Sequence, residues 1–192
     1  MDFEFRSCSG ADNLVWNFIA TLSIAFSGVA LAAGVKMALS ESQKGRVIEQ
    51  LVGATLILQS NGALRASLPL VDDESVDLVV GNRSNDKTLL LQIKGRFSLS
   101  GRGHYRANVR RATCVSNPNK FLLFVYYDTT VAGLGETCWL IRSSEFRNLL
   151  SRQKVTRPVY IFDSTFKGKG DMWVPFRIPL KDAATAILQA LK

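Results

Sequence analysis

The chain has 192 residues, of which 47% are hydrophobic, and its formal net charge is +8. This composition excludes a disordered chain and provides enough apolar residues for the core of one folded domain, with an additional segment at one end. The excess of positive charge predicts an anionic partner, which is either nucleic acid or an acidic membrane surface.

Cysteine and histidine usage excludes several kinds of site. The three cysteines, Cys8, Cys114 and Cys138, are far apart and odd in number, so they provide neither a disulfide framework nor a zinc-binding spacing. This usage suits a reducing cytosol. The single histidine, His104, excludes multi-histidine zinc sites and paired-histidine nuclease motifs, and no nucleophile-elbow pattern accompanies it.

Residues 13–35 form an uncharged segment that is long enough to cross a bilayer as a helix. Basic residues follow this segment, so the positive-inside rule places the rest of the chain in the cytoplasm. Two other interpretations compete: a buried core helix, although the segment lacks a polar face, and a start codon upstream of a true start at Met37. We therefore divide the chain into an N-terminal hydrophobic segment, 1–36, and a folded domain, 37–192.

A capping box opens the first predicted helix of the folded domain. Ser40 and Gln43 have the spacing of this motif, and apolar residues then recur at helical intervals until Gly53. Residues 54–59 predict a short apolar strand, which ends at the Asn-Gly turn signal that follows it.

Two strands, predicted over 76–80 and 88–94, form a hairpin around a polar turn. Side chains of a strand alternate between its faces, so Gln92 and Lys94 lie on the same face. Antiparallel pairing then brings Asp77, at the start of the first strand, close to both of them. Burying a carboxylate and an ammonium without purpose is costly, which makes this convergence of polar groups informative.

Further elements follow the hairpin. In chain order they are two strands, a helix, a strand and a closing amphipathic helix, over 121–127, 138–142, 145–154, 158–162 and 180–192. A first helix, a series of strands and then mixed elements predict an α/β or α+β fold with a central mixed β-sheet.

Four residues of this arrangement resemble the active-site motif of the PD-(D/E)xK nuclease superfamily: Glu49 on the first helix, Asp77 at the head of a strand, and Gln92-x-Lys94 on the next strand. The resemblance is to a branch in which glutamine replaces the second acid. Residues from about 40 to 142 resemble the intron-encoded homing endonuclease group in particular. The resemblance implies a restriction-endonuclease-like core, with helices flanking the sheet, and a Mg²⁺- or Mn²⁺-dependent DNA endonuclease.

The resemblance also implies a role for each residue. Asp77 would be the central metal ligand. The side-chain oxygen of Gln92 and the carbonyl of Ile93 would be the other ligands that the protein provides. Glu49 would bind the ion through a water or orient it. Lys94 would hold or deprotonate the attacking water, or stabilise the charge that develops on the scissile phosphate.

The sequence departs from the family pattern in two places. Val76 stands where the pattern has proline, and Gln92 stands where it has an acid. Loss of that negative charge weakens metal binding, so the alternative function is a catalytically inactive nucleic-acid-binding protein on the same fold. The nearby acidic cluster of Asp72, Asp73 and Glu74 is predicted to be a solvated turn rather than a set of ligands.

A basic stretch without any acid follows Lys94. Its glycines predict a flexible loop around the proposed cleft, and its cations would contact phosphates, which sets affinity but conveys no sequence information. The predicted nucleic-acid contacts are Arg96, Arg102, His104, Tyr105, Arg106, Arg110 and Arg111.

Double-stranded DNA is therefore the predicted partner. A homodimer or homotetramer is expected if both strands are cut, because one such site cuts one strand. A membrane partner is expected only through residues 13–35, in a third interpretation in which the basic face lies against anionic lipid.

Overall fold

The computed structural model describes residues 39–70, 75–151 and 158–192. Two features predicted from the sequence lie outside these residues, namely the hydrophobic segment 13–35 and the acidic cluster 72–74. In the described part of the chain, no helix is both long enough and apolar enough to cross a membrane.

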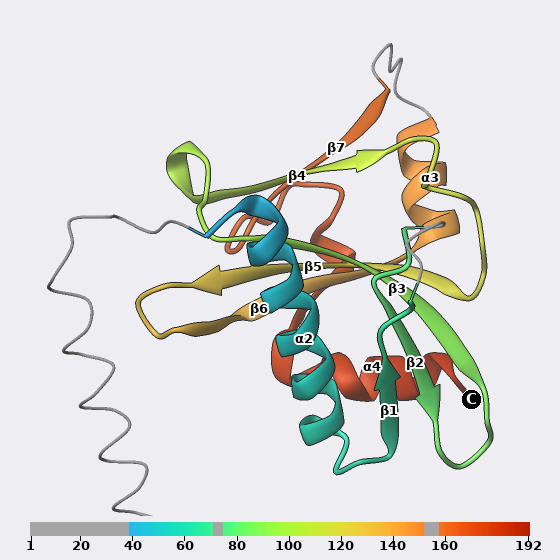
Figure 1. The fold of residues 1–192 in the computed structure, drawn as a ribbon. Coiled ribbons are helices and arrows are strands. Elements are labelled where there is room, and N and C mark those ends of the chain that lie inside the picture. Colours follow the sequence, from blue (N-terminus) through green and yellow to red (C-terminus); the bar gives the residue numbers. More distant parts are fainter. Residues whose placement is uncertain (1–38, 71–74, 152–157) are drawn as a thin grey trace, which may run out of the picture. The chain divides into compact units, whose positions relative to one another are not determined.

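Helices and strands follow one another along the described chain as shown in Figure 1. In order they are α2 (Glu41–Gln59), β1 (Leu64–Ser67), β2 (Leu78–Asn82), β3 (Thr88–Arg96), the 3-10 turn η1 (Gly101–Gly103), β4 (His104–Arg110), β5 (Lys120–Asp128), β6 (Gly133–Arg142), α3 (Ser143–Ser151), β7 (Val159–Thr165), η2 (Val174–Phe176), β8 (Arg177–Pro179), η3 (Leu180–Asp182) and α4 (Ala183–Ala190).

Among the described residues, six strands form a central mixed sheet in the order β1-β2-β3-β5-β6-β8. β3 and β5 pair in parallel, and the other neighbours in this sheet are antiparallel. A second sheet consists of β4 and β7, which pair antiparallel. We call this two-stranded sheet the ribbon.

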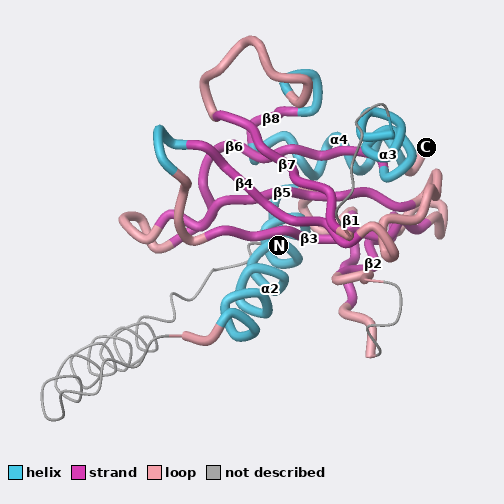
Figure 2. The backbone as a smooth tube through the Cα atoms, turned by 90° about the horizontal axis from the view of Figure 1, so that it is seen from above, coloured by secondary structure: helices cyan, strands magenta, loops and turns pink. Residues whose placement is uncertain are grey.

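The central sheet has an apolar core on each face. On one face, α2 and α4 pack against the sheet through residues such as Ile48 and Ile187. On the other face, α3 and the ribbon pack against it through residues such as Phe146 and Phe162. Figure 2 shows the strands gathered in the middle of the domain with α2 and α3 outside them. The predicted fold class, a central mixed sheet flanked by helices, is confirmed.

The first helix is longer than predicted. Its capping box is confirmed, since the Ser40 and Gln43 side chains each accept a hydrogen bond from the backbone N–H of the other residue. The helix continues through Gly53, so the predicted strand over 54–59 is wrong. A Cβ at Gly53 would lie 3.5 Å from the Leu78 side chain. Packing of the helix on β2 therefore outweighs the cost of about 1 kcal/mol for a glycine inside a helix.

Only part of the basic stretch after Lys94 is a loop, although a loop was predicted for all of it. β3 extends to Arg96, and residues 104–110 form β4, which pairs with β7. β4 was missed because its partner lies about fifty residues further along the chain, and such a distant pairing leaves no turn signal nearby. The two strands of the predicted hairpin, the three strands predicted after it and the two predicted C-terminal helices coincide with observed elements.

Candidate active site

The β2–β3 hairpin has the register that the sequence predicts. Leu78 lies opposite Leu91 and Val80 lies opposite Leu89. One residue before β2 begins, the backbone N–H of Asp77 donates to the carbonyl of Leu91 at 2.9 Å. Asp77 therefore stays attached to β3 where the hairpin opens.

The Asp77 side chain is fixed by the same strand. Its Oδ2 accepts a hydrogen bond from the backbone N–H of Ile93 at 2.6 Å. Ile93 separates Gln92 from Lys94 in the sequence, so this bond seats the carboxylate beside both side chains. The acid and the two polar residues that the sequence predicts to converge are thus brought together.

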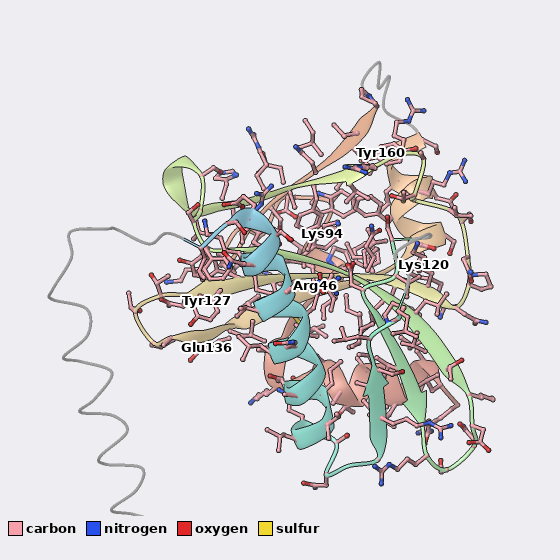
Figure 3. All side chains as sticks on the ribbon, viewed as in Figure 1. Arg46, Lys94, Lys120, Tyr127, Glu136 and Tyr160 are labelled. Atoms are coloured by element: carbon pink, nitrogen blue, oxygen red, sulfur yellow. The ribbon has the colours of Figure 1, made fainter. Side chains whose placement is uncertain are left out.

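Asp77, Gln92 and Lys94 line one open pocket of about 460 Å³. The opposite wall comes largely from the ribbon and the turn after β4, and Figure 3 shows Lys94 between β4 and the central sheet. The remaining residues that line this pocket are Ser75, Asn108, Arg110, Thr113 and Val159. We call it the hairpin pocket.

Gln92 has the least satisfied side chain of this group. The residue is only 2% exposed, and its Oε1 is buried without a hydrogen-bond partner among the described residues. A buried acceptor that lacks a partner costs about 1–3 kcal/mol. Carboxylate, amide and carbonyl oxygens are the donors that Mg²⁺ prefers, so the unsatisfied oxygen of Gln92 beside Asp77 fits a hard divalent cation.

Glu49 lies in an adjoining pocket of about 240 Å³, which Asp77 also lines. Its carboxylate is 3.5 Å from the Arg46 guanidinium, and its side chain is 17% exposed. Asp77 therefore lines both pockets. Glu49 lines the smaller one, and Gln92 and Lys94 line the hairpin pocket. No group of three or more His, Cys, Asp or Glu side chains gathers anywhere in the described ranges, so this centre has two acids and an amide.

A close approach of α2 to β3 sets the position of Glu49. Gly95 follows Lys94 directly, and a Cβ at this position would lie 2.1 Å from Cδ1 of Ile48. Cγ2 and Cγ1 of Ile48 would lie 2.9 and 3.1 Å from the same Cβ, so any larger residue would force the Ile48 side chain of α2 to move. Because Ile48 precedes Glu49, this contact brings the turn of α2 that carries the glutamate close to β3.

Tyr105 contacts the backbone of the site from the buried side of β4. Its hydroxyl donates a hydrogen bond to the backbone carbonyl of Lys94. The side chain is fully buried among Phe124, Trp139 and Phe162, and burial raises the pKa of the hydroxyl well above its ordinary value. The prediction of Tyr105 as a nucleic-acid contact is therefore wrong, because no part of the ring reaches the surface.

The basic stretch contains no acidic residue, but the fold brings an acid from another strand beside it. Asp163 of β7 accepts hydrogen bonds from Nδ1 of His104 and Nε of Arg106, each at 2.9 Å. Partial burial of Asp163 opposes ionisation, but the hydrogen bonds from Arg106 and His104 outweigh it and hold the pKa of the carboxyl below its ordinary value. His104 and Arg106 are thus held in place rather than mobile in a loop.

The other predicted basic contacts lie nearby. Nε of Arg96 donates to the Arg106 carbonyl at 2.7 Å. The Arg111 guanidinium lies 5.3 Å from the centre of the Tyr160 ring. Arg110 is exposed and lines the hairpin pocket. The side chain of Arg102 lies outside the described residues.

Five residues at the site were not predicted from the sequence, among them the pocket residues Ser75 and Val159. Asn108 and Thr113 line the hairpin pocket, and Asp163 orders the basic residues. The alternation of buried Tyr105, Ala107 and Val109 in the sequence could have revealed β4 and its outward Asn108. Nothing local marks Thr113 or Asp163, because their positions depend on long-range pairing.

Comparison with known proteins identifies a structural neighbour. No family model matches this chain, and neither does any curated protein. The fold is similar to that of the bacterial homing endonuclease I-Ssp6803I, with a TM-score of 0.51 and 18% sequence identity over 80% of this chain and 95% of that chain. At this identity the likeness establishes a shared fold.

Proposed function

We propose that this chain is a DNA endonuclease that hydrolyses phosphodiester bonds with the help of Mg²⁺ or Mn²⁺. The observation that supports the proposal most strongly is the buried, unpartnered side-chain oxygen of Gln92, a residue that lines the same pocket as Asp77 and Lys94. The fold shared with a homing endonuclease supports the same function.

The ion would be held by the Asp77 carboxylate and the Gln92 side-chain oxygen, with the Ile93 carbonyl beside them and Glu49 acting through a water. Such a cation supplies Lewis acidity to the phosphate and a nucleophile near neutral pH. The hydrogen bond from Ile93 to Asp77 fixes the carboxylate before any ligand arrives. The site therefore loses little conformational freedom on binding.

Two cations of the chain face the same pocket. Lys94 lies on the face of β3 that carries Gln92. Its neutral amine would deprotonate the attacking water, whereas its ammonium would hold that water or stabilise the charge on the scissile phosphate. Arg110 approaches from the ribbon and offers the phosphodiester a second positive charge. A nucleic-acid backbone thus fits between the hairpin and the ribbon.

Cleavage of supercoiled plasmid DNA during a titration of Mg²⁺ and Mn²⁺ tests this proposal. We expect metal-dependent cleavage that Asp77→Asn and Lys94→Ala abolish. Asp86→Asn is a matched control, because Asp86 is an exposed acid in the turn of the same hairpin and has a φ of 54°, which asparagine tolerates. DNA binding without hydrolysis in either metal would contradict the proposal and favour the inactive binding protein.

The assembly and location of the protein stay predictions. A dimer or tetramer is expected if the chain cuts both strands, and sedimentation of the full chain with duplex DNA measures this. Cytoplasmic location and anchoring through residues 13–35 are tested by fractionating cells that express the chain from Met1 or from Met37.

A further inference from the structure

The ribbon has one face in the aromatic core and one face outward. On β4, Tyr105, Ala107 and Val109 are buried, and the residues between them are not. β7 alternates in the same way, with Tyr160, Phe162 and Ser164 inward. The outward residues form the cross-strand pairs His104–Thr165, Arg106–Asp163, Asn108–Ile161 and Arg110–Val159. We call these eight residues the ribbon face.

The ribbon face is continuous with the proposed active site. Asn108, Arg110 and Val159 belong to the ribbon face and also line the hairpin pocket beside Asp77 and Lys94. A duplex whose scissile phosphate lies in that pocket would therefore continue across the ribbon. Three arginines at or beside this face, Arg106, Arg110 and Arg111, against the single acid Asp163, match the charge of such a partner.

We propose that the ribbon face enters the major groove of duplex DNA, and that Arg106, Asn108 and Ile161 contact base edges near the scissile phosphate. The inference rests on the proposed function, because the hairpin pocket fixes where the duplex lies. Paired strands are about 4.8 Å apart, and the major groove, about 12 Å wide, admits a two-stranded ribbon.

Arg106 is arranged for a base rather than for a phosphate. Asp163 accepts hydrogen bonds from its Nε and one of its terminal nitrogens, which fixes the guanidinium plane. The N–H groups at the far end of the guanidinium still form the two-pronged donor that matches O6 and N7 of guanine. The carboxylate of Asp163 would repel a phosphate at the same place, so a neutral base edge is the better partner.

Asn108 and Ile161 form a pair suited to an A·T base pair. They are cross-strand partners, and Ile161 is a large apolar side chain that is 38% exposed. An asparagine amide forms two hydrogen bonds with adenine, and an apolar side chain contacts the methyl group of thymine. Side chains opposite each other on antiparallel strands are about 5 Å apart, so one base pair can contact both.

The spacing along β4 indicates which base pairs are involved. Arg106 and Asn108 are two residues apart, which is about 6.6 Å along a strand. Base pairs in B-DNA rise by about 3.4 Å, so a ribbon that follows the groove would contact base pairs about two steps apart. We therefore expect two separate positions of the target to depend on these side chains.

Selection from a pool of duplex DNA with a randomised central segment tests the inference. The full chain is incubated with the pool in Ca²⁺, so that selection measures binding rather than hydrolysis, and bound duplexes are sequenced. We expect Arg106→Gln to lower the preference at one position by roughly tenfold or more. Asn108→Ala and Ile161→Ala are expected to lower it at a shared second position, while the other positions keep theirs.

Arg65→Gln is the matched control. It also removes one exposed arginine that pairs with an acid, Asp86, but it lies on β1, outside the ribbon. The enriched sequence should not change in this variant. If Arg106→Gln destabilises the fold, which thermal unfolding detects, the exposed Asn108→Ala and Ile161→Ala variants still decide the result.

Three outcomes would overturn the inference. They are the absence of any enriched sequence, an enriched sequence that all three ribbon variants leave unchanged, and an equal loss of binding to every sequence, which would indicate phosphate contacts. Plasmid cleavage by the unaltered chain in Mg²⁺ separates the two proposals. Cleavage without any enriched sequence contradicts the inference alone. An enriched sequence that the ribbon variants alter, without cleavage, contradicts the proposed endonuclease alone.

Discussion

The backbone N–H of Ile93 donates a 2.6 Å hydrogen bond to Oδ2 of Asp77, which ties the acid of one hairpin strand to the residue between Gln92 and Lys94 on the other. The sequence predicts that Asp77 lies near Gln92 and Lys94, and this bond in addition fixes the position of its carboxylate. The donor is the backbone N–H of Ile93, so the bond holds the Asp77 carboxylate at β3 although the Ile93 side chain points to the opposite face from Gln92 and Lys94.

Asp77→Asn separates the structural role of this residue from its charge. The asparagine oxygen can still accept the hydrogen bond from Ile93, so we expect the folded hairpin to persist. Loss of the carboxylate should lower Mg²⁺ affinity and reduce cleavage about a hundredfold or more, since a hard cation depends on charged oxygen ligands. Calorimetric titration with Mg²⁺ and the thermal unfolding midpoint measure the two effects. A variant that binds metal as the unaltered chain does would contradict this role.

Gln92→Glu and Gln92→Leu should have opposite effects on the metal. The glutamate adds a buried charge beside Asp77, so we expect lower stability without metal and a larger rise in the unfolding midpoint when Mg²⁺ is added. The leucine removes the unpartnered oxygen, so the metal-free protein should be at least as stable as before, while the response to Mg²⁺ disappears. An equal response to Mg²⁺ in both variants would show that Gln92 is no ligand.

Gly95→Ala should move α2 and, with it, Glu49. The added methyl group would lie 2.1 Å from Cδ1 of Ile48. We expect a loss of about 1–3 kcal/mol in the free energy of unfolding, and slower cleavage, because Ile48 must move and α2 packs against β3 through this residue. Gly101→Ala is the control, since no atom lies within 4 Å of the added group. Denaturant unfolding and cleavage rates measure both variants, and a neutral Gly95→Ala would contradict the close approach.

Tyr105→Phe removes the hydroxyl that holds the Lys94 carbonyl. The aromatic packing is retained, so we expect a loss of about 1 kcal/mol in the free energy of unfolding for one buried hydrogen bond. A positioning role predicts in addition a lower maximal cleavage rate with unchanged Mg²⁺ affinity, because Lys94 shifts and the ligands do not. A stability change alone, without a change in rate, would limit Tyr105 to a structural role.

Acid should weaken the Asp163 cluster. Because the pKa of this carboxyl is held below its ordinary value of 3.8, the folded state gains stability from the ionised form above pH 3.8. That stability should decline as the pH falls from 3.8 through the lowered pKa. The difference in unfolding free energy between the unaltered chain and Asp163→Asn should therefore be constant near neutral pH and shrink in acid. A difference independent of pH would contradict the ion pairing.

Local pattern was sufficient for the hairpin, and therefore for most of the candidate site. The alternation in β3 and the polar turn before it place Asp77, Gln92 and Lys94 together without any distant information. Residues 54–59 show the limit of such patterns, because an apolar run suits a strand and a buried helix equally well. Only packing of α2 on β2 decides between them.

The pairing of β4 with β7 could not be predicted, for a different physical reason. Arg106 meets Asp163 only because β4 pairs with a strand about fifty residues away, and neither segment signals the other. Tyr105 was misplaced for the same reason. An aromatic residue among arginines in a loop suggests stacking on bases. In a strand, alternate side chains point to opposite faces, and Tyr105 occupies a position that points into the core.

Anomalous diffraction from Mn²⁺ bound to crystals of the full chain tests the central claim most directly. We predict a peak in the hairpin pocket, in contact with the Asp77 carboxylate and the Gln92 side-chain oxygen, that disappears in Asp77→Asn crystals. A peak elsewhere, or an empty hairpin pocket at saturating Mn²⁺, would contradict the metal-dependent active site described above.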